Sequence, residues 1–237
     1  KSPVLPLFAA TTGAVSGWLV HDAGAISTCD ANFAACGTAL APASKALALL
    51  GLGLNKALLN LDDRLFVYDG DTDTLSPAIF TVPAGTVVRA SAADATHIYF
   101  AHERSIYRAP IDGSAAAVVI AAEANDTTFQ MSVTQNKVVY LTGGIGLGMQ
   151  LKALDKAGGV SATLADAPSG NFGIFFVNGN NVYYNFTEQV AVGASISIVP
   201  LLAGSVDESG GSKSEVTNAA WAGTLSTTTL DAGKSGT

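Results

Sequence analysis

Short apolar runs alternate with clusters of Asn, Asp, Gly and Thr along most of this chain. Three of the runs contain tyrosine, His97-Ile-Tyr-Phe100, Val138-Val-Tyr-Leu141 and Val182-Tyr-Tyr-Asn185, and each follows a cluster of turn-forming residues. Asn and Gly tolerate the left-handed backbone conformations that tight hairpins need. The abundant alanines stand among Thr, Ser, Gly and Val and not at helical spacing. The pattern therefore predicts strands joined by hairpins.

The tyrosine runs recur at a regular interval. Tyr99, Tyr140 and Tyr184 align at spacings of 41 and 44 residues. Each run is followed by a second predicted strand, and the aligned segments are Ser105–Gly113, Leu151–Gly159 and Ile196–Gly204. Further strands are predicted before and after these pairs, at 87–91, 117–121, 129–133, 161–165 and 172–177. The repeating unit is therefore four short strands in about 40–45 residues.

Earlier copies of the unit are less regular. Residues 57–68 align with residues 97–108 at an offset of 40, which superposes Arg64 on Arg104, and Ser76–Val82 is the predicted fourth strand. Segments 17–20, 25–29 and 37–40 are predicted strands of a degenerate first unit. Four strands per unit of this length are typical of β-propeller blades. The chain is long enough for about five, so we predict an all-β fold, a propeller or partial propeller.

The unit Ile98-Tyr-Phe100 with Ile106-Tyr-Arg-Ala-Pro-Ile-Asp-Gly113 resembles the blades of secreted bacterial β-propeller proteins, in which V-Y-[FW] and I-x-R-V-P-x-D-G recur. The resemblance is strongest over residues 57–204 and implies an extracytoplasmic binding or scaffold role. Leu154-Asp-Lys and Leu202-Ala203 depart from the Pro-x-Asp-Gly turn. No ligand site of the family is therefore carried over to this chain.

These patterns divide the chain. Residues 1–204 are predicted to be blades, with 57–204 the clearest repeats and 1–56 the degenerate first blade; 205–214 is a Gly/Ser-rich loop and 215–237 closing strands or a tail. The apolar segment Lys45–Asn55 is consistent with a buried strand, which we favour, a short buried helix or an exposed patch. Val190–Val206 has no charged residue but contains Pro200 and alternates, so we predict a strand and turn and no membrane span.

The low content of charged residues and the negative net charge exclude some classes of function. Only 13% of the 237 residues are charged, 49% are hydrophobic, and the net charge is −7. The chain is too apolar for an acidic disordered protein and too acidic for nucleic-acid binding. Stacked sheets that bury both faces account for most of the low charge. The first 55 residues carry only four charges, so a partner surface is expected there.

Cys29 and Cys36 are predicted to form a disulfide that closes a small loop, with two buried thiols as the alternative. Such a short bridge stabilises by about 2–3 kcal/mol in the chain-entropy model. It implies an oxidising compartment: extracellular, periplasmic or cell surface. A chain that begins at Lys1 is expected to be a mature or trimmed product. Asn125 and Asn185 fit the N-glycosylation acceptor pattern.

The strongest candidate for chemistry is Asp69, Asp71 and Asp73, whose alternate spacing is that of a calcium loop. Thr74 and Phe80 stand where such a loop needs Gly and Glu, so a plain acidic turn is the favoured alternative. Gly143–Gly148 lacks phosphate-loop spacing and is predicted to be a hairpin tip. The turn at His102 is expected to be solvated. No catalytic motif is found, and no cofactor beyond this candidate calcium is predicted.

Three hypotheses of different classes follow. The leading one is an extracytoplasmic binding or structural propeller, with protein partners or self-assembly at the cell surface or in an extracellular filament. The low charge suits dense assembly because few charges need desolvation at contacts. A calcium-dependent propeller hydrolase is the second hypothesis, although an enzyme is less favoured. A carbohydrate-binding module is the third.

Overall fold

The computed structural model describes residues 4–8, 15–22, 25–37, 41–42, 46–53, 55–123, 128–144, 148–167, 171–192 and 195–217. All regular elements among them are strands, and these form five antiparallel sheets. The all-β prediction of about five four-stranded blades is therefore confirmed. The chain divides into two compact units, Lys1–Asp126 and Thr127–Thr237, which are described separately.

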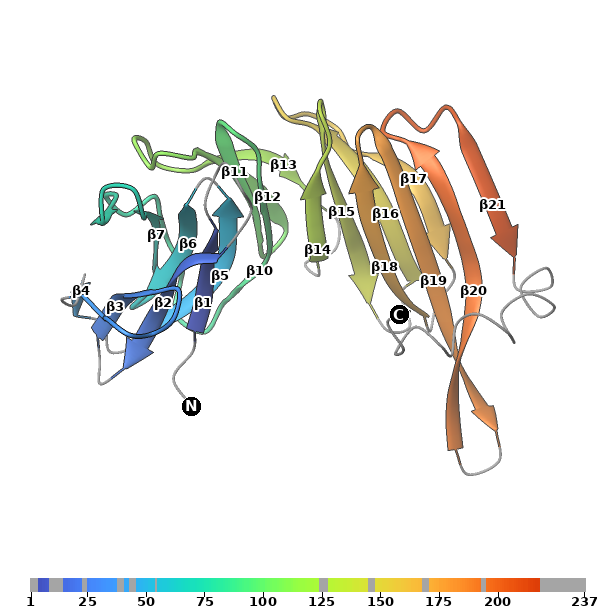
Figure 1. Cartoon of the computed structure of the whole chain (residues 1–237). Helices are drawn as coiled ribbons and strands as arrows, with labels where there is room; N and C mark the ends of the chain where they lie inside the picture. Colours follow the sequence, from blue (N-terminus) through green and yellow to red (C-terminus); the bar gives the residue numbers. More distant parts are fainter. Residues whose placement is uncertain are drawn as a thin grey trace. The chain divides into compact units, whose positions relative to one another are not determined.

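The first unit contains three sheets (Figure 1). Sheet 1 comprises β1 (Val4–Phe8), β2 (Val15–Asp22), β3 (Ala25–Asp30) and β4 (Ala41–Pro42). Sheet 2 comprises β5 (Ala46–Gly53), β6 (Lys56–Leu61), β7 (Arg64–Asp69), β8 (Thr74–Leu75) and β9 (Phe80–Thr81). Sheet 3 comprises β10 (Val88–Ala93), β11 (His97–His102), β12 (Ser105–Pro110) and β13 (Val118–Ala122).

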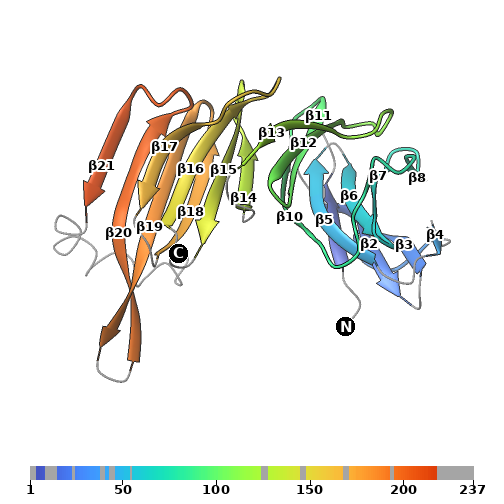
Figure 2. The ribbon, with the colours of Figure 1, turned by 180° about the vertical axis from the view of Figure 1, so that it is seen from behind.

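The second unit contains two sheets. Sheet 4 comprises β14 (Thr128–Val133), β15 (Lys137–Gly144), β16 (Gly148–Asp155) and β17 (Ala162–Ala167). Sheet 5 comprises β18 (Asn171–Asn178), β19 (Asn181–Val192), β20 (Ser195–Asp207) and β21 (Lys213–Thr217). Strands β19 and β20 are longer than their neighbours, and their paired ends project beyond the rest of the sheet (Figures 1 and 2).

Several local predictions can be compared with these strands. The segment Lys45–Asn55 contains the predicted strand, β5, which has two register irregularities; its burial stays a prediction. The uncharged segment Val190–Val206 lies in the β19–β20 hairpin, as predicted. The expected fourth strand Ser76–Val82 is instead not continuous: β8 ends at Leu75, before the segment begins, and β9 occupies only Phe80–Thr81 within it. The loop expected at 205–214 is shorter, because β20 continues to Asp207 and β21 begins at Lys213; residues 218–237 lie outside the described residues.

The tyrosine alignment is wrong by one residue. The turns that open the second strands of sheets 3 and 4 have matching hydrogen bonds, Asp94 N to His97 O and Thr134 N to Lys137 O, which sets an offset of 40 between them. Phe100, and not Tyr99, is therefore the equivalent of Tyr140. In sheet 2 the last pair before the β6–β7 turn is Leu61 with Arg64, and in sheet 3 it is His102 with Ser105. The offset between sheets 2 and 3 is therefore 41, and not the 40 that aligned residues 57–68 with 97–108. An error of one residue in such an alignment assigns each side chain to the wrong face of its sheet.

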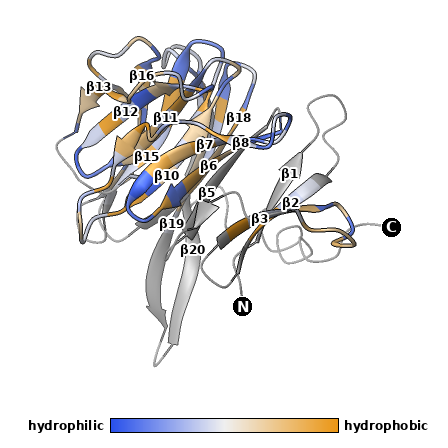
Figure 3. Ribbon diagram, turned by 90° about the vertical axis from the view of Figure 1, so that its left-hand side faces the viewer, coloured by the Kyte–Doolittle hydropathy of each residue, from blue (hydrophilic) through white to orange (hydrophobic). Residues whose placement is uncertain are grey.

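The cores lie between neighbouring sheets of one unit. Leu58, Leu65 and Val67 of sheet 2 pack against Ile98 and Phe100 of sheet 3. In the second unit, one cluster joins sheet 4 to sheet 5, and its largest members are Leu141, Leu151, Leu164, Phe175, Tyr184 and Phe186. Hydrophobic and hydrophilic residues are mixed along β10, β11 and β12 in Figure 3, as expected for strands that turn alternate side chains to opposite faces.

The third strand of most sheets ends in a similar turn. The carbonyl oxygens of Asp30, Pro110, Asp155 and Asp207 each accept a hydrogen bond from the amide three residues later. Gly113 shows why glycine suits the end of this turn: its φ is +68°, and a Cβ there would lie 2.3 Å from the Cβ of Ser76. The Pro-Ile-Asp-Gly motif therefore specifies backbone geometry and not chemistry.

Candidate functional site

The candidate functional site is one face of sheet 5, formed by Ile174 and Phe176 of β18 with Tyr183 and Asn185 of β19. Ile174 pairs with Asn185 and Phe176 pairs with Tyr183, so the four side chains point to the same side. Their neighbours Phe175, Tyr184 and Phe186 point the opposite way, into the core shared with sheet 4. We call these four residues the β18–β19 face.

The β18–β19 face is more exposed than the matching face of sheet 4. The hairpin turns make Val139 and Leu141 the counterparts of Tyr183 and Asn185. Val139 and Leu141 are 0% and 1% exposed beneath sheet 5, whereas Tyr183 and Asn185 are half-buried.

The neighbouring strands of the two sheets differ in the same direction. Gln130 and Ser132 of sheet 4 are half-buried, whereas their counterparts in sheet 5, Ile174 and Phe176, are 66% and 62% exposed. These are large apolar side chains in water, and grouped exposed apolar residues mark interaction surfaces.

The face is aromatic and uncharged. The rings of Phe176 and Tyr183 stack with centroids 4.8 Å apart and planes 8° from parallel. The next strand contributes Ala203, opposite Asn185, and Ser205, opposite Tyr183. A partner binding here would have no charged side chain of these six to desolvate, so apolar contact would supply most of the binding free energy.

Hydrogen bonds hold sheet 5 against sheet 4 behind this face. The side chain of Gln130 on β14 donates to the carbonyl oxygen of Phe175 at 2.6 Å and accepts from its amide at 3.1 Å. One side chain thus satisfies both backbone groups of a residue on β18. The strand that carries Ile174 and Phe176 is therefore fixed from its inner side.

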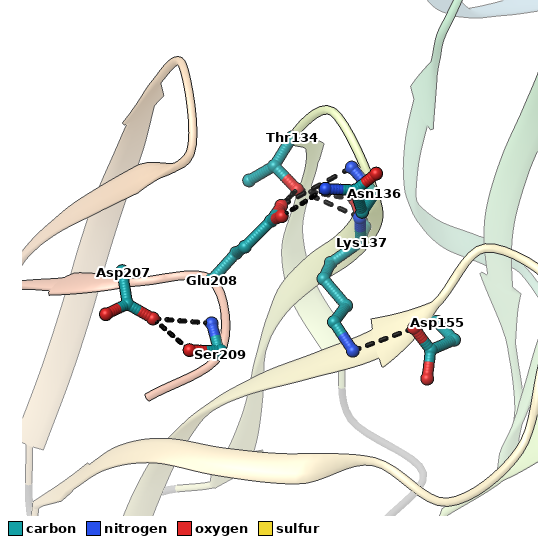
Figure 4. Close-up of polar contacts among 7 residues, drawn as sticks. All are labelled: Thr134, Asn136, Lys137, Asp155, Asp207, Glu208 and Ser209. Carbon is teal, nitrogen blue, oxygen red and sulfur yellow. Dashed lines mark hydrogen bonds and ion pairs between the residues drawn. The ribbon is translucent and has the colours of Figure 1, made fainter. Parts of the chain in front are cut away.

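Glu208 forms a second link between the two sheets (Figure 4). This side chain, 8% exposed in the turn after β20, accepts hydrogen bonds from the Thr134 hydroxyl and, at 2.6 Å, from Asn136 Nδ2. Burial alone would raise the pKa of Glu208, but the bonds from Thr134 and Asn136 hold it below its usual value. Beside it Lys137 pairs with Asp155 at 2.7 Å.

A cavity of about 320 Å³ lies in the first unit beside the Cys29–Cys36 disulfide, which the structure confirms. Its polar lining includes Thr28, Asp30, Asn55, Tyr68 and Asp73, and none of the described residues that line it is basic. The Tyr68 hydroxyl donates to Asp73 Oδ1 at 3.0 Å, and burial followed by this contact raises the pKa of Tyr68 well above its ordinary value. The cavity is polar and acidic.

The calcium candidates have separate partners in this region. Asp69 forms an ion pair with Lys56, Asp71 accepts from Asn55 at 3.0 Å, and Asp73 binds Tyr68. Burial raises the pKa of Asp69, but Lys56 and the backbone amides lower it more. Within the described part of the chain, no three His, Cys, Asp or Glu side chains are placed together to hold a metal ion. The calcium site stays a prediction.

Other expectations need correction. His102 is not solvated: it is 3% exposed, its Nε2 lies 2.7 Å from the Thr86 hydroxyl, and the Phe80 ring packs 5.2 Å away. Burial lowers the pKa of His102. Of the sequons, Asn125 lies outside the described residues, and the side-chain oxygen of Asn185 is buried. Much of the expected N-terminal partner surface also lies outside them, although Phe33 is 50% exposed and stacks on Trp18.

Sequence reasoning missed the β18–β19 face. Tyr99, Tyr140, Tyr184 and Phe175 are buried, whereas Tyr183 is only half-buried. The available signal was the continuous apolar run Ile174-Phe-Phe-Val177, which places large side chains on both faces of one strand. Among the described residues there is no helix that could span a membrane.

Comparison with known proteins shows the fold. No protein-family model matches the sequence, and no curated protein is significantly similar to it. The structure is similar to an oligogalacturonate lyase in complex with manganese, with a TM-score of 0.56, 15% identity, and coverage of 92% of this chain and 74% of the lyase. It is also similar to the dihydro-heme d1 dehydrogenase NirN in complex with DHE, with a TM-score of 0.52, 12% identity, and coverage of 90% of this chain and 46% of the dehydrogenase.

A nidogen/laminin complex is a third similar structure, with a TM-score of 0.50, 13% identity, and coverage of 91% of this chain and 80% of that one. The chain thus spans less than half of the dehydrogenase but most of the other two. At these identities the likeness shows a β-propeller fold, which hosts both enzymes and binding proteins.

Proposed function

We propose that this protein is an extracytoplasmic binding module, which uses the β18–β19 face for protein–protein interaction or assembly at a cell surface or in an extracellular filament. The observation that carries the proposal is the exposure of Ile174 and Phe176, 66% and 62%, on a face whose counterpart in sheet 4 is half-buried at Gln130 and Ser132 and buried at Val139 and Leu141. Covering such side chains contributes about 25 cal/mol per Å² of apolar surface removed from water.

Two further observations support the proposal. The Cys29–Cys36 disulfide suits an oxidising compartment, because thiols stay reduced in the cytosol of most organisms. One protein of similar fold was solved as a complex between nidogen and laminin, an example of a similar structure engaged with a protein partner. Binding through a rigid sheet also needs little ordering on association.

Photocrosslinking tests this function. The full chain carrying p-benzoyl-phenylalanine at Ile174 would be expressed in its source cells and irradiated, with the same amino acid at Val160, which is 96% exposed, as the matched control. We expect a protein adduct from position 174 that is absent from position 160. Equal adducts from both positions, or none from position 174, would contradict the proposal.

The calcium-dependent hydrolase is kept as a second candidate because one predicted ligand, Asp73, lines the cavity of the first unit. The carbohydrate-binding module has one supporting observation, the stacked and partly open pair of Phe176 and Tyr183. A glycan array on the unmodified protein and on Phe176→Ala tests the latter. Binding lost in the variant would favour a sugar over a protein at this face.

A further inference from the structure

We propose that His102 is a pH-sensitive latch in the first unit, which holds the connection between sheets 2 and 3 closed while its ring is neutral and releases it on acidification. The connection is the segment 82–87, which joins β9 to β10. The inference goes beyond the proposed function and does not depend on it, because the β18–β19 face belongs to the second unit.

The connection contains a tight turn that fixes the position of Thr86. The Thr86 amide donates a hydrogen bond to the carbonyl oxygen of Pro83 at 3.0 Å, which closes the turn. Gly85 stands at the third position with φ +82°, the left-handed conformation that a type II turn requires there.

Thr86 links this turn to His102 on β11. Its hydroxyl donates to the carbonyl oxygen of Pro83 at 2.6 Å and lies 2.7 Å from His102 Nε2. A hydroxyl has one proton, so its oxygen accepts the second bond and Nε2 of His102 carries the hydrogen. The neutral ring therefore holds the turn through a directed hydrogen bond, and Nδ1 is the atom that takes up a proton.

The surroundings of the His102 ring favour its neutral form. The side chain is 3% exposed. The ring centroids of Phe80 and Tyr107 lie 5.2 Å and 6.3 Å from that of His102, and both rings meet it edge-on. Burying a positive charge among such groups costs free energy unless opposite charges or hydrogen bonds compensate for it.

The ionisable groups around the ring do not offset this cost. Residues 80–88, which include Phe80 and the turn, have no titratable side chain. Burial lowers the pKa of His102 more than the negative charge of Glu103, the next residue, raises it. The other ionisable groups of the surrounding elements are a phenol on β12, a buried carboxylate after β13 and exposed side chains at strand ends: Tyr107, Glu123, Asp63, Arg64, Arg89 and Arg104.

Acidification is therefore expected to open the latch. A histidine in water titrates near about pH 6.5, whereas the buried ring takes up its proton at a lower pH. The open state binds the proton first, so the latch is fully closed above about pH 6.5 and weakens as the pH falls through the folded-state value. Within that interval, the equilibrium constant for opening rises by up to about tenfold per pH unit.

Opening affects the contact between sheets 2 and 3. Phe80 of β9 packs against Phe100 and Tyr107 of sheet 3, with ring centroids 5.3 Å and 4.8 Å apart. Strand β9 is paired with β7 at two positions, Thr81 with Arg64 and Phe80 with Leu65. Because so short a strand is weakly held, release of the connection frees Phe80 from sheet 3 without unfolding the core beneath it.

Hydrogen exchange measured by NMR on the full chain tests the latch. The reporter is the Thr86 amide, which is protected while the turn is closed because Pro83 is its acceptor. The internal control is the Gly113 amide, which donates to Pro110 in a turn of sheet 3. After correction for intrinsic exchange, we expect the protection of Thr86 to fall by about three- to tenfold between pH 7.5 and 5.5, while that of Gly113 stays constant.

Two variants and a direct titration assign the effect to His102. His102→Gln keeps a donor for Thr86 but does not titrate, so the protection of Thr86 is expected to be equal at the two pH values. His97→Gln removes the other histidine of β11 and is the matched control, which is expected to behave like the unmodified chain. The imidazole signals of the unmodified chain are expected to show a midpoint for His102 below about pH 6.5.

The inference is overturned if the protection of Thr86 in the unmodified chain does not change with pH, or if it falls equally in His102→Gln. A midpoint of His102 above that of a histidine in water would also overturn it, because acidification would then tighten the turn. The exchange and the titration of the unmodified chain decide the question even if His102→Gln does not fold.

Discussion

Sheets 4 and 5 place corresponding faces in different surroundings. Val139 and Leu141 of sheet 4 lie beneath sheet 5 and are 0% and 1% exposed, whereas their counterparts Tyr183 and Asn185 are half-buried. On β18, beside them, Ile174 and Phe176 are 66% and 62% exposed. These residues are paired in the same way in both sheets. The pairing of the strands therefore does not decide which face of a sheet is buried.

Buried residues between sheets 4 and 5 and exposed residues on the β18–β19 face contribute differently to the free energy of unfolding. A residue between two sheets contributes to folding because unfolding exposes it to water, while a residue on the β18–β19 face is exposed in both states. Substitutions on the two faces should therefore affect different measurements, stability in one case and association in the other.

Leu151→Ala, in the core between sheets 4 and 5, is expected to cost about 2–5 kcal/mol of unfolding free energy, because it leaves a cavity at a residue that is 0% exposed. Ile174→Ala is expected to change stability by less than about 0.5 kcal/mol. Urea unfolding followed by circular dichroism measures both. Similar losses for the two variants would show that the β18–β19 face is covered in the folded protein.

Glu208→Ala is expected to lower the unfolding free energy by about 1–3 kcal/mol, because Thr134 and Asn136 lose their buried acceptor between sheets 4 and 5. Asp166→Ala removes an exposed carboxylate from the same unit and serves as the control. The same urea titration compares the two. A neutral Glu208→Ala variant would mean that these bonds contribute no net stability and that apolar packing and the Gln130 hydrogen bonds fix sheet 5.

The stability supplied by Glu208 is expected to depend on pH. Its pKa is lower in the folded chain than in the unfolded chain, where a glutamate titrates near about 4.3. The unfolded state therefore binds a proton first, and the contribution is complete above about pH 4.3 and disappears as the pH falls through the folded-state value. The stability difference between the unmodified chain and Glu208→Ala should shrink over that window. A difference that grows on acidification would reverse the assigned direction.

Millimolar calcium is expected to leave the melting temperature unchanged, because Asp69, Asp71 and Asp73 are held by Lys56, Asn55 and Tyr68 respectively. This is the smallest effect, and it concerns the first unit and not the β18–β19 face. Differential scanning fluorimetry with calcium and with a chelator measures it. A rise in melting temperature that Asp73→Asn abolishes would establish the predicted calcium site.

Much of the fold could be predicted because strand and turn signals are local. The clusters around Asp94 and Asn178 predict hairpins from side-chain and backbone preferences alone, and the 40–45-residue interval then predicts four-stranded sheets. The alignment of Tyr99 with Tyr140 failed for a physical reason. Adjacent residues of a strand are equally apolar when both faces are buried, so composition cannot distinguish the two registers, and only the hydrogen bonds of the turns do.

The candidate site was harder to predict than the fold. The sequence shows that Ile174, Phe175 and Phe176 are apolar, but it does not show that Phe175 enters the core while its neighbours stay exposed. His102 was mistaken for a solvated turn residue because the packing of Phe80 and the hydroxyl of Thr86 come from segments 16–22 residues earlier in the chain. Contacts of this kind leave no local signal.

By itself, then, the sequence determined that the chain is built of short antiparallel strands in repeating units, that Cys29 and Cys36 are close enough to pair, and that few charges stand in the way of stacking. These properties depend on backbone preferences and on residues near one another in the chain. The tertiary structure alone decided that sheet 4 is covered and that Ile174 and Phe176 are exposed on sheet 5. Coverage is a property of which sheets meet in space, and identical apolar patterns are a core or an interface according to whether a second sheet lies above them.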